Sequence, residues 1–486
     1  MFVKFCGCAP AVFILLTICT VFLEAKTFVT RRNFATKSRY PFYSKSEDFG
    51  TPRNCKPLHI NMVFRHGTRY PSTKDIEGMN KLEVDIERLF NKDDPVKYRE
   101  LTLPWTNRFK NGPDKMLSRK GEEEMYNIAK RLLERFPTLF NRVYFGEKHH
   151  FVSTATPRTI RSASAFAFGL FEGKGHLGPS NFQPVSMVTT NLTEPVLRFF
   201  DVCPVYQEKV MENRKVPLME LHKFQRGPEM VQVKKAIADR LNVSGSFNIT
   251  ADHIRDMFLS CAYELAIYGE GEWCSIFEED DLDIVEYLYD IKNYWKRGYG
   301  YEINYIMSCL LLKNLTGSVR EVAKAVENSH PHTHTDDHTN DHTHAIFHFS
   351  HAETLIPLLC IMGLFNDTEP LLASNYDSQK NRLFKTSKMA PFSGNVAVVL
   401  YSCNKNPKNQ SVQVLVNEKV AALPCCGLKD LCPLQDFLAC FGDIDQWCDF
   451  SKICSPAAGH NYRYYIITTI ITISTLSLVR YFYCKH

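Results

Sequence analysis

The chain lacks the features that mark several classes of protein. Its 486 residues carry a formal net charge of only +5, spread along the chain, and no zinc-finger, RNA-recognition or basic-zipper pattern is present. No internal repeat is visible. We therefore expect no nucleic-acid partner. The apolar fraction of 44% is globular, and the length fits one large catalytic unit with an inserted lobe.

Paired CxxC units are also missing, although cysteine is plentiful at 17 residues. The C-terminal cysteine cluster therefore favours disulfides over a zinc module, and we expect no metal or other cofactor. Three cysteines fall in the first 25 residues and Cys484 lies in the tail. The remaining 13 are an odd number, so we expect at least one without an intrachain partner. The cluster consists of Cys425, Cys426, Cys432, Cys440, Cys448 and Cys454.

The N-terminus is typical of a signal peptide over residues 1–25. Lys4 precedes an apolar run from Ala9 to Leu23, and Ala25 offers a cleavage point. A buried N-terminal helix is the alternative, but basic residues follow at once. Six N-x-S/T sequons also favour a glycosylated protein of the secretory pathway, at the cell surface or outside the cell. They lie at Asn191, Asn242, Asn248, Asn314, Asn366 and Asn409.

The tail, residues 456–486, favours membrane attachment. The uncharged stretch from Tyr464 to Val479 is shorter than the roughly 20 residues of a spanning helix, though Arg480 could snorkel. Small residues from Ser455 to Gly459 offer a site for a lipid anchor instead. A buried strand or helix is the less favoured third interpretation, and the sequence does not separate the two anchors.

Strand-turn-helix patterns occur at both ends of the body, residues 26–455. A strand over Leu58–Phe64 ends in a glycine turn, a helix is expected from Ser118 or Arg119 to Phe136, and another from Pro157 to Phe171. The segment "AIFHFSHAETLIPLLCIMGLF" repeats the pattern, and "NVAVVLYSC" and "QSVQVLVNEKVAAL" indicate a late antiparallel pair. We expect an α/β unit with helical insertions at about 75–145 and 172–345.

A histidine-rich stretch precedes the "AIFHFS" strand and could bind zinc or copper. No apolar framework fixes a coordination geometry there, so we favour a solvated low-complexity loop. Its histidines are His330, His332, His334, His338, His342, His344 and His348.

Three separated pieces carry the candidate chemistry, each where a strand meets its helix. They hold Arg65, His66 and Arg69, then Arg158, then His351 and Glu353. Open α/β sheets bind ligands at this carboxyl edge. The arginines offer donor forks that match phosphate oxygens, and their charge disfavours the imidazolium form of the histidine between them. A neutral histidine can attack phosphorus.

The motifs "RHGTRYP" and "HAET" together resemble the histidine acid phosphatases, in the multiple inositol polyphosphate phosphatase branch. The runs "WCSIFEEDD", "YWKRGYGY" and "APFSGN" extend this resemblance over roughly residues 50–455. It implies a mixed sheet flanked by helices, with a mostly helical inserted lobe. It also implies hydrolysis of inositol polyphosphates, such as inositol hexakisphosphate, through a phosphohistidine. A broad acid phosphatase or bisphosphoglycerate phosphatase is the alternative, and a non-catalytic surface binding protein a weaker one.

The resemblance assigns roles to individual residues. His66 is the nucleophile, Arg65, Arg69, Arg158 and His351 bind the phosphate, and Glu353 is the proton donor and later the base. Ala352 separates His351 from this acid, whereas most of the family has an adjacent His-Asp pair. The implied disulfides are Cys55–Cys403, Cys261–Cys274, Cys203 with Cys454, and Cys425 or Cys426 with Cys432. The remaining pairing of the cluster stays open.

Overall fold

The computed structural model describes residues 33–41, 50, 52–90, 93–140, 142–213, 215–328 and 342–456. The expected signal peptide and the membrane-attachment tail lie outside these residues. Within them, no helix is both long enough and apolar enough to cross a membrane.

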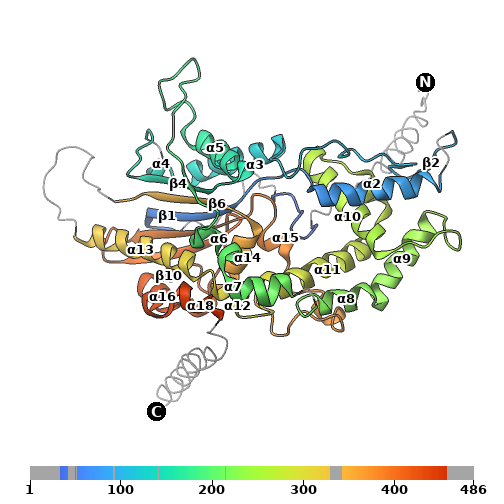
Figure 1. The fold of residues 1–486 in the computed structure, drawn as a ribbon. Coiled ribbons are helices and arrows are strands. Elements are labelled where there is room, and N and C mark those ends of the chain that lie inside the picture. Colours follow the sequence, from blue (N-terminus) through green and yellow to red (C-terminus); the bar gives the residue numbers. More distant parts are fainter. Residues whose placement is uncertain are drawn as a thin grey trace, which may run out of the picture.

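A mixed sheet forms the centre of the molecule (Figure 1). Its strand order is β10-β8-β7-β1-β6-β4-β5, and β9 pairs with β8. The strands are β1 (Cys55–Arg65), β4 (His149–Thr154), β5 (Val188–Thr190), β6 (Ala345–Ser350), β7 (Asn395–Cys403), β8 (Gln410–Val416), β9 (Lys419–Val420) and β10 (Cys432–Pro433). The strands β1, β6, β4 and β5 run parallel, and β7 and β8 are the expected antiparallel pair.

Helices cover both faces of this sheet, as the sequence predicts (Figure 1). On one face α3 (Arg119–Arg135), α4 (Pro137–Phe140) and α5 (Pro157–Phe171) pack on the even-numbered side chains of β1. On the other face lie α6 (Pro195–Val202), α13 (Cys309–Asn328) and α14 (Ala352–Ile361). Ser118 caps α3 by accepting a hydrogen bond from the Gly121 amide, and Pro157 begins α5.

The remaining helices lie mainly beside one end of the sheet or against its lower layer (Figure 1). They are α2 (Thr73–Glu87), α7 (Pro204–Tyr206), α8 (Met219–Gln225), α9 (Pro228–Arg240), α10 (Ala251–Tyr268), α11 (Glu279–Arg297), α12 (Ile303–Ile306), α15 (Thr386–Met389), α16 (Leu434–Ala439), α17 (Ile444–Trp447) and α18 (Phe450–Ile453). A hairpin of β2 (Val96–Tyr98) and β3 (Leu101–Leu103) follows α2. The division of the chain into core and insertions stays a prediction.

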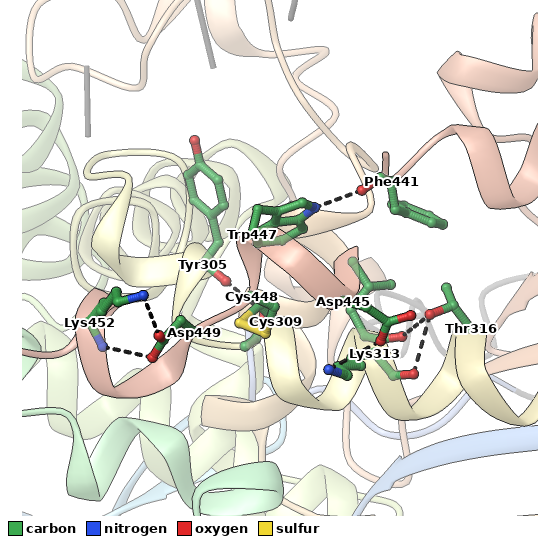
Figure 2. Close-up of a disulfide and its surroundings, with 12 residues drawn as sticks. Tyr305, Cys309, Lys313, Thr316, Phe441, Asp445, Trp447, Cys448, Asp449 and Lys452 are labelled. Carbon is green, nitrogen blue, oxygen red and sulfur yellow. Dashed lines mark hydrogen bonds and ion pairs between the residues drawn. A yellow bond between two sulfur atoms is a disulfide. The ribbon is translucent and has the colours of Figure 1, made fainter. Parts of the chain in front are cut away.

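The described residues contain six disulfides, three of which join segments far apart in the sequence. They are Cys55–Cys403, Cys203–Cys454, Cys261–Cys274, Cys309–Cys448, Cys425–Cys440 and Cys426–Cys432. The resemblance implied four of these pairs and left the other two open. Figure 2 shows one of these two pairs, Cys309–Cys448, beside the ion pair of Lys313 with Asp445. Among the described cysteines only Cys360 is free, and it is buried.

Only the last part of the histidine-rich stretch lies within the described residues. Its first four histidines lie outside them, and His348 is buried inside β6. His342 and His344 are half-buried, and the carbonyl of His344 accepts a hydrogen bond of 3.0 Å from the Ile60 amide. The interpretation of a solvated loop is therefore wrong from His342 onward, because this part leads into the sheet.

Candidate active site

Three parallel strands bring the candidate residues to one edge of the sheet. β1, β6 and β4 are neighbours, so the residues that follow them lie side by side. His66 follows β1 and His351 follows β6, and their ring centroids are 5.8 Å apart. Arg158 lies in the first turn of α5, after β4, and its guanidinium is 3.2 Å from Nδ1 of His351. The three separated motifs therefore form one site.

The backbone around His66 is tightly held. The His66 amide donates to the Ser350 carbonyl and its carbonyl accepts from the Ser393 amide, both at 3.0 Å. A Cβ atom added to Gly67 would lie 2.4 Å from the carbonyl oxygen of Gly121 in α3. Only glycine permits so close an approach, which explains the glycine of the "RHGT" turn.

The buried carboxylate of Glu124 completes this support. It accepts hydrogen bonds from the amide and hydroxyl of Thr68 and from the hydroxyl of Ser393, at 2.8 to 3.0 Å. Burial raises the pKa of Glu124, and the hydrogen bonds from Thr68 and Ser393 oppose that rise. Sequence reasoning missed Glu124, which looks like one of several glutamates in the first turns of a helix.

His66 has the state that a nucleophile needs. It is buried, and its pKa lies well below the usual value because of burial, then the charges of Arg65, Arg158 and Arg69. Nδ1 is 2.9 Å from the Gly67 carbonyl oxygen. A carbonyl can only accept, so Nδ1 carries the proton and the lone pair is on Nε2.

The arginines form a cluster with unused hydrogen-bond donors. Burial, then repulsion from Arg69, lowers the pKa of Arg65 to about 9 and that of Arg158 to about 10. A fourth arginine, Arg198 of α6, lies 3.2 Å from Nε2 of His351 and was not predicted. The buried Nε atoms of Arg65, Arg158 and Arg198 have no hydrogen-bond partner in the described structure. Unpaired hydrogen-bond donors and closely spaced positive charges are both features of an anion-binding site.

His351 is a neutral member of this cluster. Burial, then the charge of Arg158, lowers its pKa to about 3. Arg158 contacts its Nδ1, while Arg198 and Thr154 contact its Nε2. A neutral imidazole accepts at only one nitrogen, so the two guanidinium groups cannot both be satisfied by it. At least one of them is held ready for another acceptor.

Glu353 begins α14 and is 36% exposed, so an incoming ligand can reach it. Its Oε1 accepts a hydrogen bond of 2.9 Å from Arg297, the last residue of α11. Burial on its own would raise the pKa of Glu353, but Arg297 and the other neighbouring charges hold it well below its usual range. The free carboxyl is therefore ionised. Arg297 was missed, although it lies in the "YWKRGYGY" run that resembles the family.

Comparisons with known proteins agree with this geometry. Residues 58–417 match the model of the histidine phosphatase superfamily (branch 2). The human multiple inositol polyphosphate phosphatase 1 is 33% identical over 418 residues, which cover 84% of this chain and 83% of the relative. An acid phosphatase of Schizosaccharomyces pombe is 26% identical and covers 79% of each chain.

Solved structures share the fold. A multiple inositol polyphosphate phosphatase of Bifidobacterium longum, in complex with inositol hexasulfate, superposes with a TM-score of 0.63 at 15% identity. The match covers 85% of this chain and 98% of that one. The phytase from D. castellii superposes with a TM-score of 0.62 at 17% identity, covering 87% of each chain.

Proposed function

Because this chain belongs to branch 2 of the histidine phosphatase superfamily, among the multiple inositol polyphosphate phosphatases, we propose that it hydrolyses phosphomonoesters of inositol polyphosphates. Inositol hexakisphosphate is the substrate that we expect. The observation that carries the proposal is a neutral His66, with its lone pair on Nε2, beside arginines whose buried Nε donors are unpaired. A phosphate group would satisfy these donors and lie within reach of the nucleophile.

In the first step, Nε2 of His66 attacks phosphorus and the bond from phosphorus to the ester oxygen breaks. Arg65, Arg69 and Arg158 stabilise the charge on the transferring group, and His351 donates its single N–H to it. The leaving inositol alkoxide takes a proton from Glu353. In the second step water gives a proton to Glu353 and attacks the phosphohistidine, which releases phosphate and restores His66.

The proton on Glu353 has to arrive with the substrate, because Glu353 is ionised in the free site. A bound phosphate adds negative charge beside the arginines that hold the pKa of Glu353 down, so binding raises this pKa. A phosphomonoester has its second pKa near 6 and carries a proton in mildly acidic solution. Arg297, at 2.9 Å, keeps the carboxyl in place while its proton changes.

The test compares inositol hexakisphosphate, bisphosphoglycerate and nitrophenyl phosphate as substrates, with product analysis. We expect lower inositol phosphates and inorganic phosphate to appear, with the highest kcat/KM on inositol hexakisphosphate. Equal rates on all three esters would favour the broad acid phosphatase instead.

A His66→Ala variant should remain folded by circular dichroism and lose all but a few per cent of turnover. Labelled phosphate should be trapped on the wild-type enzyme by a denaturing quench at alkaline pH, and not on the variant. A variant that keeps substantial turnover would remove His66 as the nucleophile.

We also propose that the protein acts in the secretory pathway, attached to a membrane. Six disulfides among the described residues support an oxidising compartment, and the asparagines of all six sequons are exposed. Treatment with an N-glycosidase should increase electrophoretic mobility. Truncation after Cys454 should release the protein from membranes into the medium, and release by a phosphatidylinositol-specific phospholipase would identify a lipid anchor. A full-length protein recovered wholly in the soluble fraction would refute the attachment.

A further inference from the structure

A segment outside the residues matched by the family model lies directly against the catalytic arginines. This segment, residues 33–41, precedes residue 58, where the family match begins. The Thr36 carbonyl accepts a hydrogen bond of 2.6 Å from Arg65, and the Ser38 carbonyl accepts one of 3.0 Å from the Phe392 amide. The segment is therefore docked on the wall of the site.

Its conformation is well defined. The Ser38 hydroxyl accepts from the Phe34 amide at 2.7 Å and donates to the Ala35 carbonyl at 2.8 Å, which closes a tight turn. Phe34 is only 1% exposed and packs against Phe258 of α10. The turn directs Lys37 to the Tyr263 ring, with Nζ at 5.7 Å from its centroid.

Lys37 is a half-buried cation without an anion. Arg69 lies against the same Tyr263 ring, at 6.0 Å, and no described carboxylate is within ion-pair distance of Lys37. Among the carboxylates, Asp75 has the strongest electrostatic effect on Lys37, and it accepts hydrogen bonds from Ser72 and Tyr263. Burial, then repulsion from Arg69, lowers the pKa of Lys37 to about 7. An unpaired ammonium in such a place is costly unless an anion binds beside it.

Lys37 borders the pocket for the reacting phosphate through the arginines. Arg69 lies against the same Tyr263 ring as Lys37, and Arg65 donates to the Thr36 carbonyl of the same segment. Among the described contacts, those of His66 and His351 do not include Lys37.

We propose that Lys37 binds a phosphate group of the substrate other than the one being hydrolysed, so that segment 33–41 forms part of the substrate site. This inference rests on the proposed function, since only a polyphosphorylated substrate offers a second phosphate. It makes segment 33–41 a determinant of the preference for polyphosphates over simple monoesters.

The test uses Lys37→Met, with Lys37→Arg to keep the charge. Lys56→Met is the matched control, because Lys56 is an exposed lysine at the start of the strand that ends at Arg65. Loss of one charged hydrogen bond corresponds to about a 10- to 100-fold loss of affinity. We expect Lys37→Met to lose that much kcat/KM on inositol hexakisphosphate and less than about threefold on nitrophenyl phosphate.

Inhibition separates this inference from the proposed function. With nitrophenyl phosphate as the reporter substrate, the Ki of inositol hexasulfate should rise about 10- to 100-fold in Lys37→Met. The Ki of inorganic sulfate should not change, and Lys37→Arg and Lys56→Met should match the wild type within about threefold. Unchanged hexasulfate inhibition in Lys37→Met, or equal losses on both substrates, would overturn the inference. A wild type that binds hexasulfate but does not hydrolyse inositol hexakisphosphate would instead refute the proposed function.

Discussion

Replacing Glu353 with Gln tests its proposed role as proton donor while leaving the rest of the site in place. Glutamine has nearly the same shape, and its carbonyl oxygen can still accept the hydrogen bond that Arg297 donates at 2.9 Å. The variant therefore loses the titrating proton and the negative charge but keeps the packing. An inositol alkoxide is a poor leaving group that needs a proton in the transition state, whereas a nitrophenolate leaves with little help.

The expected loss of rate combines two effects, the loss of the proton donor and a weaker hydrogen bond to Arg297. General acid catalysis is typically worth about 10² to 10⁴-fold in rate. Weakening the bond to Arg297 from a charged to a neutral hydrogen bond costs about 1 kcal/mol, or about fivefold, and affects both substrates alike. We therefore expect kcat/KM, which reports on formation of the phosphoenzyme, to fall about 10² to 10⁴-fold on inositol hexakisphosphate and less than about tenfold on nitrophenyl phosphate.

The assay is steady-state kinetics on both substrates, with quenched-flow measurement of the phosphoenzyme. Phosphohistidine should still form rapidly from nitrophenyl phosphate and should break down slowly, because Glu353 is also proposed to activate the water. Arg297→Met is the companion variant, since it keeps the carboxylate and removes its partner. A Glu353→Gln variant whose kcat/KM falls by the same factor on both substrates would refute the reasoning and assign Glu353 to binding or folding.

Further predictions concern the rest of the molecule. Gly67→Ala should destabilise the protein by about 1–3 kcal/mol in urea unfolding and reduce kcat, because the new Cβ would lie 2.4 Å from the Gly121 carbonyl oxygen; an unchanged midpoint would contradict that contact. Burial lowers the pKa of His59 and of His348 to about 4. The unfolded chain takes up these protons near pH 6.5, so the contribution of the two histidines to stability should be constant above that pH and fall as pH drops toward 4. The double variant with Gln at both positions should flatten this slope in urea titrations, and an unaltered slope would assign it to other groups. Deletion of residues 330–340 should leave activity within a few-fold with or without a chelator, whereas a lost metal-dependent activity would show a functional metal site.

The sequence by itself predicted much of the sheet and its nearest helices. Pro157 to Phe171 forms one helix with the expected bounds, and the late antiparallel strand pair is present. These elements follow from local signals, namely apolar periodicity, a proline at the first helical position and a glycine turn, which neighbouring residues supply. The same signals predicted that His66 and Arg158 follow the ends of strands. The resemblance to the histidine acid phosphatases predicted that these ends lie close together.

The tertiary structure alone decided which other residues serve the site. Arg198, Arg297 and Glu124 lie far from "RHGTRYP" in the sequence, and each looks like an ordinary surface charge of a helix. Their roles come from contacts over long sequence separations, with His351, Glu353 and the backbone after β1, respectively. Such contacts leave no pattern in the sequence. The spacing of charged residues along a helix is the same whether a given charge faces solvent or a buried partner. Only the packing of the helices on the sheet decides which charges face the candidate site.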